Sequence, residues 1–242
     1  MIEKTLSIII PCYNESKNLE KLIKNIKKIL EQVNFNIEVI LVNNGSTDNT
    51  ENKLQELLKE NKKIKVVNIE KNIGYGNGIL AGLSYAKNNY LGWTHADLQC
   101  DFNDCLKGFE ILYQANLKNG SNYLLKGRRL NRDYLDVLFT RLMSIFIKVL
   151  CQFDLEDVNA QPKIFPRKLY NLFKTPPKDF LLDFYLMHLS VKNNYKILNK
   201  DVYFSNRIHG ESKGGGSFFG KIKLSLRTAY YIFKYHYGNN NT

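Results

Sequence analysis

A short apolar run near the middle of the chain ends in closely spaced polar side chains. Residues 91–101 read Leu-Gly-Trp-Thr-His-Ala-Asp-Leu-Gln-Cys-Asp. Alternate side chains of an extended segment point the same way, so we expect His95, Asp97 and Gln99 to converge just beyond a strand end. A hard divalent cation prefers oxygen ligands and keeps several waters while it holds a diphosphate. The spacing therefore predicts a metal-assisted site for a nucleotide-activated donor.

A second polar segment follows the first apolar run of the chain. Pro11 is expected to end a strand, because proline cannot donate a ladder hydrogen bond. The turn after it then presents Tyr13, Asn14 and Glu15 to a nucleoside. An ordinary strand-to-helix turn, capped by Asn14 or Ser16, accounts for the same residues.

Turn-forming residues and glycines follow the next two apolar runs. Asn43–Asp48 has turn and helix-cap chemistry. It is expected to cap a helix through Ser46, Thr47 or Asp48 and to leave Asn44 free for a ligand, with capping alone as the alternative. Gly74, in the glycine-rich stretch 74–78, lets backbone approach a ligand closely. The stretch lacks the G-x-G-x-x-G spacing of a dinucleotide-binding fingerprint.

Six residues in the second half of the chain have the chemistry to hold phosphate. They are Arg128, Arg129, Arg141, Arg207, Ser212 and Lys213. The arginines offer forked donors that match phosphate oxygens, and the last three residues surround a glycine in a loop suited to wrapping a phosphate. Most other basic residues are expected to form a solvated surface.

Asp183 is a carboxylate within an apolar segment, 180–186, where an acidic residue is unusual. It is a candidate general base if the acceptor is a hydroxyl. If the acceptor is a lipid phosphate, which is already anionic, no base is needed and Asp183 has only to hold a neighbouring arginine. Asp157 and Gln161 either line the acceptor pocket or order their own loop.

Composition limits the class of protein. The 242 residues suffice for one sizeable α/β domain, and Lys and Arg (35) exceed Asp and Glu (23) by 12. This excess favours anionic partners such as phosphates and lipid headgroups. The four cysteines lack C-x-x-C spacing and are expected to be reduced thiols. We expect neither a signal peptide nor a membrane-spanning segment.

Apolar periodicity predicts alternating strands and helices. Expected strands are 6–11, 37–42, 64–69, 91–94, 123–126 and 202–205, and expected helices are 16–31, 54–58, 78–87, 104–117, 134–153, 180–192 and 217–237. This alternation predicts a mostly parallel sheet with helices on both faces. Ligands of such sheets bind beyond the carboxyl ends of the strands, where the polar segments described above lie.

Seven motifs, taken in order, resemble the family 2 glycosyltransferases with the GT-A fold, near the dolichyl-phosphate mannose synthase-like branch. They are Pro11–Glu15, Val42–Asp48, Asn72–Gly76, Ala96–Gln99, Gly127–Arg129, Asp157–Gln161 and Arg207–Lys213. Two motifs depart from the family. The family's Asp-x-Asp is His95-Ala96-Asp97 here, so His95 replaces the first aspartate, and Asn43 and Asn44 replace both acids of the usual Asp-Asp-Gly-Ser motif. Imidazole suits Mn²⁺ better than Mg²⁺.

The resemblance implies roles for these residues. The implied catalytic residues are Asp97, Asp183 and Arg207. Residues implied to bind the nucleotide sugar are Pro11, Tyr13, Asn14, Glu15, Asn44, Gly45, Ser46, Gly74, Ala96, Asp97, Arg128, Arg207, Ser212 and Lys213. Implied acceptor residues are Arg129, Arg141, Asp157 and Gln161, and the implied ligands of Mg²⁺ or Mn²⁺ are His95, Asp97 and Gln99.

The C-terminal segment 217–237 alternates basic and aromatic residues. Such a helix suits the membrane interface without spanning the bilayer; the alternative is a helix whose apolar side packs on the domain. We lean to membrane contact, because 134–153 adds a second apolar surface. We predict a GT-A domain over 1–213, with a Rossmann-like nucleotide-sugar part (1–127) and an acceptor part (128–213), followed by this helix (214–242).

The resemblance implies an inverting glycosyltransferase. It would move a sugar from a UDP- or GDP-linked donor to polyprenyl phosphate or a lipid-linked glycan, as a peripheral protein at the cytoplasmic face of an anionic membrane. Transfer to a surface-polysaccharide hydroxyl and a non-catalytic nucleotide- or lipid-binding protein are the alternatives. Charge alone suggests nucleic-acid binding, and we predict none because the sequence has no recognition motif.

Overall fold

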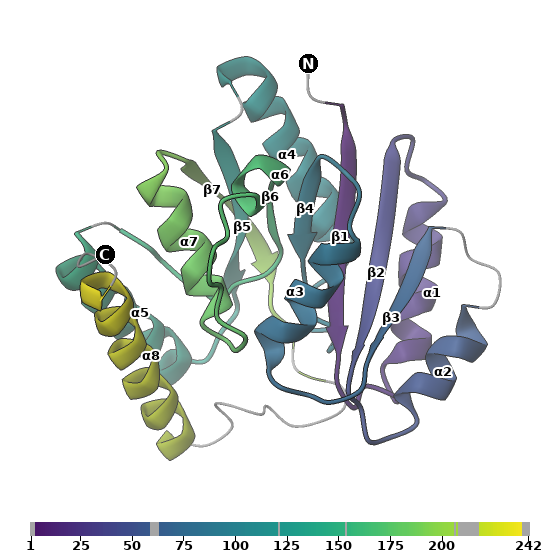
Figure 1. Ribbon diagram of the computed structural model, residues 1–242, viewed down its shortest axis with the longest axis horizontal. Helices are drawn as coiled ribbons and strands as arrows, with labels where there is room; N and C mark the ends of the chain where they lie inside the picture. Colours follow the sequence, from purple (N-terminus) through teal and green to yellow (C-terminus); the bar gives the residue numbers. More distant parts are fainter. Residues whose placement is uncertain are drawn as a thin grey trace.

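The computed structural model describes residues 3–58, 63–120, 122–152, 154–205, 207 and 218–238. A seven-stranded sheet with the order β3-β2-β1-β4-β6-β5-β7 lies between two layers of helices (Figure 1). The strands are β1 (Thr5–Cys12), β2 (Asn36–Asn44), β3 (Ile64–Ile69), β4 (Tyr90–Trp93), β5 (Tyr123–Leu130), β6 (Lys163–Pro166) and β7 (Lys196–Tyr203). The helices are α1 (Leu19–Leu30), α2 (Thr50–Leu57), α3 (Tyr75–Tyr85), α4 (Asn103–Asn119), α5 (Tyr134–Cys151), α6 (Arg167–Tyr170), α7 (Leu182–Lys192) and α8 (Phe218–Gly238).

The central strands form because their residues are apolar on both sides. In β1, Ile8 and Ile10 face one layer of helices and Ile9 faces the other, and all three are buried. Such a continuous β-branched run is typical of a parallel strand covered on both faces. β1 pairs in parallel with β2 and β4, as the alternation of elements predicts.

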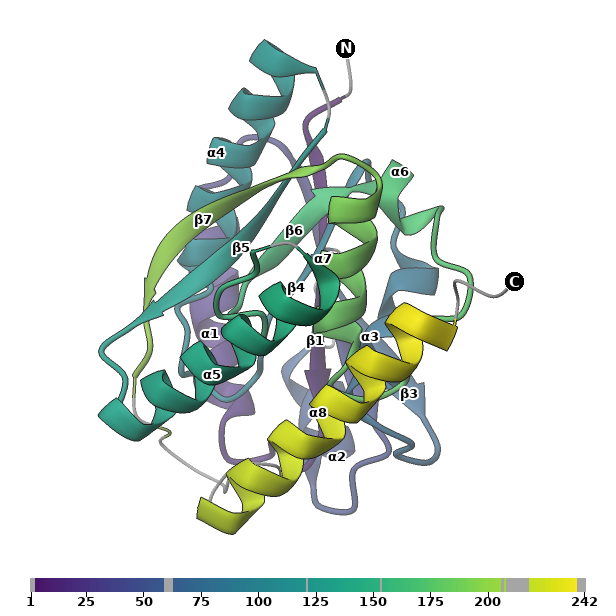
Figure 2. The same cartoon turned by 90° about the vertical axis from the view of Figure 1, so that its left-hand side faces the viewer.

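Each face of the sheet has its own core. On one face, α1, α2 and α4 bury residues such as Leu22, Leu54 and Phe109 against β1 and β2. On the other face, α3, α5, α6, α7 and α8 pack around a cluster that includes Trp93 and Phe165. Figure 2 shows α5 and α8 side by side at the outside of this second layer. The second core joins residues from both halves of the chain.

The sequence predicts the first five strands near their observed positions but misses β6 and expects the last strand at 202–205, whereas β7 covers Lys196–Tyr203. The missed strand, β6, covers only Lys163–Pro166 and runs antiparallel to both of its neighbours, β4 and β5. Four residues with a lysine at the first position give too little periodicity to reveal a strand. The expectation that Pro11 ends the first strand is wrong, because β1 continues to Cys12, which is in register with Asn43 of β2.

The parallel strands β1, β2, β3 and β4 all point their carboxyl ends toward the lower edge of the sheet in Figure 1. The polar segments that follow β1, β2 and β4 therefore meet at one edge. None of the helices within the described ranges combines the length and the apolar character needed to cross a bilayer.

Candidate active site at the carboxyl edge of the sheet

The segments after β1 and β2 form one continuous rim. Asn14 has a left-handed φ of 56°, and its backbone N–H donates to Ser46 Oγ at 3.1 Å. The side-chain oxygen of Asn14 accepts from the Thr47 backbone N–H at 2.8 Å, and the Glu15 N–H donates to Thr50 Oγ1 at 2.9 Å. Asn14 therefore joins two loops and does not cap α1.

Close packing between backbone segments explains the glycines of this edge. Gly45 has a φ of +66°, and a Cβ there would lie 2.3 Å from the backbone nitrogen of Asn72. Gly74 has a φ of +136°, and its Cβ would lie 2.2 Å from the carbonyl oxygen of Lys178. The sequence predicts that Gly74 allows close approach of a ligand. In the structure it allows close approach of the segment that precedes α7.

Asn44 is buried and holds the same turn. Its amide nitrogen donates to the carbonyl oxygen of Gly74 at 3.0 Å, while its side-chain oxygen has no hydrogen-bond partner among the described residues. A buried polar atom without a partner is costly. Asn44 thus stabilises the loop through one side of its amide and offers an acceptor on the other.

Asp97 lies at the centre of the site and is only 5% exposed. Its Oδ2 accepts a hydrogen bond from Arg207 Nη2 at 2.8 Å, and its Oδ1 accepts from the Gln99 backbone N–H at 3.1 Å. The same Nη2 donates to Gln99 Oε1 at 3.3 Å, and His95 Nδ1 lies 3.9 Å from Asp97 Oδ2. The structure thus brings together the three predicted metal ligands and Arg207, which is 110 residues further along the chain than Asp97.

The oxygen and nitrogen atoms of these side chains suit a cation that takes its remaining ligands from a bound phosphate. Among the described residues, no three His, Cys, Asp or Glu side chains are grouped closely enough to hold a metal ion. Asp97 Oδ2 and Gln99 Oε1 nevertheless converge on one positively charged nitrogen of Arg207. A divalent cation held by one carboxylate usually takes its remaining ligands from substrate phosphates and water. These side chains therefore fit a metal that the donor helps to bind.

Tyr75, at the start of α3, connects His95 to Gln161, one of the residues predicted to contact an acceptor. Its hydroxyl lies 3.1 Å from His95 Nε2 and accepts from Gln161 Nε2 at 3.3 Å. Its ring stacks on Phe180 with 5.0 Å between ring centroids. Burial raises the pKa of Tyr75, and the negative charges of Asp183 and Asp97 raise it further. Burial also lowers the pKa of His95, against the opposing effect of Asp97.

Asp183 is buried in an ion pair with Lys163. Lys163 Nζ lies 2.8 Å from Asp183 Oδ1, and Trp93 Nε1 donates to the same oxygen at 3.0 Å. Gln161 Nε2 adds a contact at 3.2 Å. Burial lowers the pKa of Lys163 while the Asp183 carboxylate opposes this effect. Asp183 thus has a structural partner, as one of the two sequence-based alternatives requires, but the partner is a lysine rather than an arginine.

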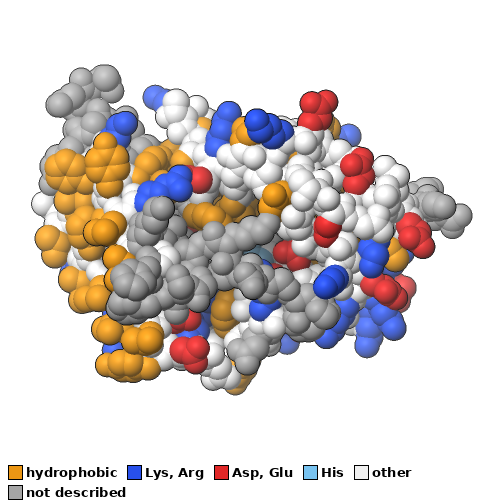
Figure 3. All heavy atoms as spheres, turned by 90° about the horizontal axis from the view of Figure 1, so that it is seen from below, with side chains coloured by type: hydrophobic (Ala, Val, Ile, Leu, Met, Phe, Trp, Pro, Cys, Tyr) orange, Lys and Arg blue, Asp and Glu red, His pale blue; other side chains and the backbone are white. Residues whose placement is uncertain are grey.

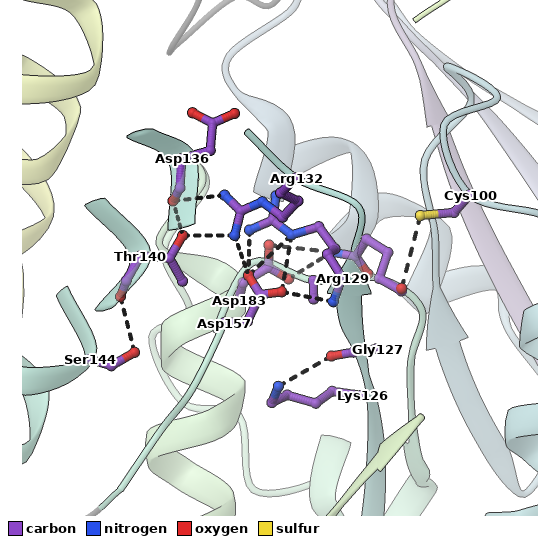
Figure 4. Close-up of polar contacts among 12 residues, drawn as sticks. Cys100, Lys126, Gly127, Arg129, Arg132, Asp136, Thr140, Ser144, Asp157 and Asp183 are labelled. Atoms are coloured by element: carbon purple, nitrogen blue, oxygen red, sulfur yellow. Dashed lines mark hydrogen bonds and ion pairs between the residues drawn. The ribbon is translucent and has the colours of Figure 1, made fainter. Parts of the chain in front are cut away.

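A second buried carboxylate, Asp157, is surrounded by positive charge (Figure 4). Arg129 Nε donates to both carboxylate oxygens, at 3.0 and 3.1 Å, and the Arg129 backbone N–H donates to Oδ2 at 3.0 Å. Arg132 Nη1 lies 3.5 Å from Asp157 Oδ1. Burial raises the pKa of Asp157, but the Arg129 hydrogen bonds and charge lower it overall. The predicted acceptor residues Arg129 and Asp157 are therefore in contact.

Lys126 and Arg132 complete this cluster, and the sequence does not single them out. Lys126 is buried, is in register with Lys163 on the next strand, and donates to the Gly127 carbonyl at 3.1 Å. Burial lowers the pKa of Lys126 to about 8. Arg132 is held by Thr140 Oγ1 at 2.9 Å and by the Asp136 carbonyl. A lysine within the short apolar strand segment 123–126 is the one signal that would have revealed Lys126.

The other predicted site residues lie in different surroundings. Arg128 forms an exposed ion pair with Asp201 of β7, with 2.5 Å between Nε and Oδ1, and Arg141 is exposed on α5. Tyr13 is half-buried, Ala96 is buried in the first core, and Pro11 belongs to β1. Ser212 and Lys213 lie outside the described residues.

Apolar side chains are exposed on the two outer helices, α5 and α8. We call this the α5–α8 surface; it comprises Tyr134, Leu135, Leu138, Leu142, Ile145, Val149, Leu226, Tyr230 and Phe233. Figure 3, which views the molecule from the carboxyl edge of the central strands, shows apolar side chains gathered on this side. A recess near the middle of the same face contains histidine and acidic side chains. Ile232 of α8 is buried, so this helix also packs on the second core.

Sequence comparison finds a family model that matches the N-terminal part of the chain. Residues 7–118 match the family model described as Glycosyl transferase family 2. This chain is related to the family 2 glycosyltransferases. The matched range contains β1 to β4 and the predicted metal ligands His95, Asp97 and Gln99. The family assignment predicted from the motifs is therefore supported, while the dolichyl-phosphate mannose synthase-like branch stays a prediction.

Two bacterial relatives share parts of the sequence. The uncharacterized glycosyltransferase sll0501 from Synechocystis is 40% identical over 94 residues, which cover 39% of this chain and 30% of that protein. The putative glycosyltransferase CsbB from Bacillus subtilis is 26% identical over 174 residues, covering 71% of this chain and 51% of that protein. The chain thus spans about half or less of the length of these relatives.

Solved structures confirm the predicted GT-A fold. Glucosyl-3-phosphoglycerate synthase from Mycobacterium tuberculosis, in complex with Mn²⁺, UDP-glucose and glycerol 3-phosphate, superposes with a TM-score of 0.69 at 17% identity, over 97% of this chain and 80% of that one. The complex of the same enzyme with Mg²⁺ and UDP gives a TM-score of 0.68 at 14% identity, over 97% of this chain and 79% of that one. At this identity the match establishes the fold alone.

Proposed function

We propose that this protein is an inverting glycosyltransferase that moves a sugar from a nucleoside-diphosphate donor to an acceptor carrying a phosphate. The observation that carries the proposal is the contact of Arg207 with Asp97 beside the rim formed by Asn14 and Ser46. Loops far apart in sequence there combine a polar rim, a carboxylate and a guanidinium. The family 2 match over residues 7–118 supports the same activity.

The donor is proposed to lie across the carboxyl ends of β1, β2 and β4. Its nucleoside contacts the rim of Tyr13, Asn14 and Ser46, and its diphosphate lies at Asp97 and Arg207. Either UDP or GDP suits this description; UDP is the first candidate because glucosyl-3-phosphoglycerate synthase was solved with UDP. Bound Mg²⁺ or Mn²⁺, held by Asp97 with Gln99 and His95, would neutralise negative charge that grows on the departing diphosphate.

In this mechanism the acceptor oxygen attacks the anomeric carbon from the side opposite the diphosphate. Positive charge develops on the sugar, as in glycoside hydrolysis, and the guanidinium of Arg207 stabilises the leaving phosphates. Asp183 is fully engaged by Lys163 and Trp93, so we assign it the positioning of Gln161. An acceptor phosphate is already ionised at neutral pH and needs no general base.

The buried charges on the acceptor side favour a phosphate over a plain hydroxyl. Among the described residues, four cationic side chains, Lys126, Arg129, Arg132 and Lys163, lie around two buried carboxylates, Asp157 and Asp183. Buried charge without a counter-charge is costly, and an acceptor phosphate supplies the missing negative charge. Forked guanidinium donors match phosphate oxygens.

The α5–α8 surface suggests that the phosphate belongs to a lipid. Soluble monomers rarely expose so many large apolar side chains together, and exposed basic residues such as Arg227 lie on α8. An aromatic and basic helix suits the interface of an anionic membrane. We therefore propose polyprenyl phosphate as the acceptor and peripheral binding at the cytoplasmic membrane face. A lipid-linked glycan or a surface-polysaccharide hydroxyl is the alternative acceptor.

A ligand screen followed by an acceptor assay tests this function. A thermal-shift screen of nucleoside diphosphates with Mg²⁺ and Mn²⁺ should identify the base, because ligands that bind only the native state raise its stability. Transfer from the matching sugar nucleotide is then measured to polyprenyl phosphate in anionic vesicles and to soluble glycans. Transfer to the lipid supports the proposal. Transfer only to glycans overturns the acceptor, and nucleotide binding without turnover on any donor supports a non-catalytic protein.

A further inference from the structure

Arg207 contacts the same two oxygen atoms that are expected to hold the cation. One nitrogen, Nη2, donates to Asp97 Oδ2 at 2.8 Å and to Gln99 Oε1 at 3.3 Å. A guanidinium nitrogen that lies this close to both oxygens excludes a metal ion from direct bonds to them. The positive charge of Arg207 thus takes the place that a divalent cation would need.

The surrounding contacts fix this arrangement. Asp97 is 5% exposed, and its second oxygen accepts the backbone N–H of Gln99. Gln99 in turn forms two hydrogen bonds with Ser205: its side-chain nitrogen donates to the Ser205 carbonyl at 3.0 Å, and the Ser205 N–H donates to its carbonyl at 2.9 Å. The Gln99 amide is therefore held with its side-chain oxygen toward Arg207. Ser205 lies two residues before Arg207 in the sequence.

We propose that Arg207 and the divalent cation replace each other at Asp97, and that the donor diphosphate drives the exchange. This inference rests on the proposed function. A buried carboxylate left without a cation is strongly unfavourable, so Arg207 leaves Asp97 only when another positive charge arrives. The diphosphate offers Arg207 anionic oxygens that suit its forked donors. Once Arg207 has turned to the phosphates, Asp97 and Gln99 are open to the metal.

The exchange predicts how nucleotide and metal affect each other. Without nucleotide the metal has to displace Arg207, so its binding is weak. When the nucleotide is bound, Arg207 already contacts the diphosphate and no longer has to be displaced from Asp97. The metal therefore binds more tightly. Such coupling is reciprocal: the metal strengthens nucleotide binding by the same factor. A static ion pair, kept unchanged when the metal binds, predicts instead that UDP strengthens Mn²⁺ binding by the same factor in Arg207→Ala as in wild type.

Titration of the full chain with Mn²⁺, followed by electron paramagnetic resonance of free Mn²⁺, tests the exchange. We compare wild type, Arg207→Ala and Arg207→Lys, each with and without UDP. Lys148→Ala is the matched control, because it removes one positive charge from an exposed ion pair with Asp154. The expected result is that Arg207→Ala binds nucleotide-free Mn²⁺ more tightly than wild type by about five- to 150-fold, the usual range of coupling. Lys148→Ala should bind it as wild type does.

The variants also separate geometry from net charge. Arg207→Lys keeps the charge but lacks the forked group, so its nucleotide-free Mn²⁺ affinity should lie between those of wild type and Arg207→Ala. UDP should strengthen Mn²⁺ binding less in Arg207→Ala than in wild type. Circular dichroism of each variant confirms folding before titration, and Arg207→Lys serves alone if Arg207→Ala fails to fold.

Two outcomes contradict different parts of the account. If wild type binds Mn²⁺ together with UDP but Arg207→Ala binds nucleotide-free Mn²⁺ no more tightly than wild type, the exchange is wrong and the proposed function stands. If wild type binds neither UDP nor Mn²⁺ with any nucleoside diphosphate, the proposed function itself fails.

Discussion

Lys163 and Asp183 form an ion pair inside the second core, with 2.8 Å between Nζ and Oδ1 and almost no exposure of either side chain. The pair joins β6 to α7 and lies directly behind Gln161, which contacts Asp183. The ion pair holds Gln161 in place, and breaking it would leave a buried polar group without its partner.

Breaking this ion pair should destabilise the protein strongly. Asp183→Asn or Lys163→Met alone leaves one buried polar group without its partner, at a cost of about 3–5 kcal/mol in the free energy of unfolding. The double variant Lys163→Met with Asp183→Leu should recover much of this loss. Urea unfolding measures all three. Lys148→Ala, which breaks an exposed pair, should cost less than about 1 kcal/mol, and equal losses for buried and exposed pairs would contradict the prediction.

Lys126 should make stability rise with pH. Burial lowers its pKa in the folded state to about 8, whereas an unfolded lysine titrates near 10.4. Between these values the unfolded chain binds the extra proton, so stability increases as the pH rises through this window. The gain is about 1.4 kcal/mol for each unit between the two pKa values.

The control for Lys126 is Lys126→Met, which removes the titrating group and keeps a similar volume. Subtracting its unfolding free energies from those of wild type between pH 7 and pH 10.5 isolates this lysine from other titrating groups. Lys126→Met should be more stable than wild type at pH 7, and the difference should shrink as the pH rises. A difference that is constant with pH would disprove the assignment. Phosphate bound near Lys126 should also reduce the difference in unfolding free energy between Lys126→Met and wild type at pH 7.

Gly74 should not tolerate a side chain. Gly74→Ala imposes a left-handed φ of +136° and brings Cβ within 2.2 Å of the Lys178 carbonyl oxygen. Gly120 is a matched control, because it has a φ of +73° but no atom within 4 Å of its Cβ position. Gly120→Ala should cost about 1–2 kcal/mol from backbone strain alone. Gly74→Ala should cost clearly more by urea unfolding, and similar losses would refute the packing role.

Tyr75 should matter more for activity than for stability. Tyr75→Phe keeps the stacking on Phe180 and removes the contacts with His95 and Gln161. Losing hydrogen bonds of this kind usually costs about 0.5–1.5 kcal/mol each, which corresponds to a fall of up to about tenfold in kcat/KM for each bond. Tyr195→Phe, just before β7, is the control and should leave kcat/KM unchanged. Equal kcat/KM values for both variants would remove Tyr75 from the site.

The sequence predicts the fold, and the grouping of His95, Asp97 and Gln99, because both rest on repeated or spaced signals. Buried β-branched runs such as 37–42 reveal the strands, and His95, Asp97 and Gln99 follow one of them at alternate positions. The contact of Asp97 with Arg207 follows from matching the order of motifs to a family. The local sequence around either residue does not indicate it.

The proposed acceptor side is harder to predict because it is formed by isolated polar residues that belong to no motif. Lys163 lies in a four-residue strand, and Arg132 follows two more conspicuous arginines, so neither stands out. The partner of Asp183 depends on how α7 packs on β6, which sequence spacing does not specify. Gly74 illustrates the same limit. The sequence predicts that its backbone allows close approach, but tertiary packing determines that the segment that approaches it is the one containing Lys178.

The most direct test of the central claim is sugar transfer by wild type and Asp97→Asn under identical conditions. Labelled UDP- and GDP-sugars are supplied with Mn²⁺ and polyprenyl phosphate in anionic vesicles, and labelled lipid is counted. Wild type should transfer sugar from one donor, and Asp97→Asn should lose at least about 100-fold of that rate, as when a main electrostatic contact is removed. Full activity of Asp97→Asn, with folding and nucleotide binding intact, would contradict the assignment of the donor diphosphate to Asp97.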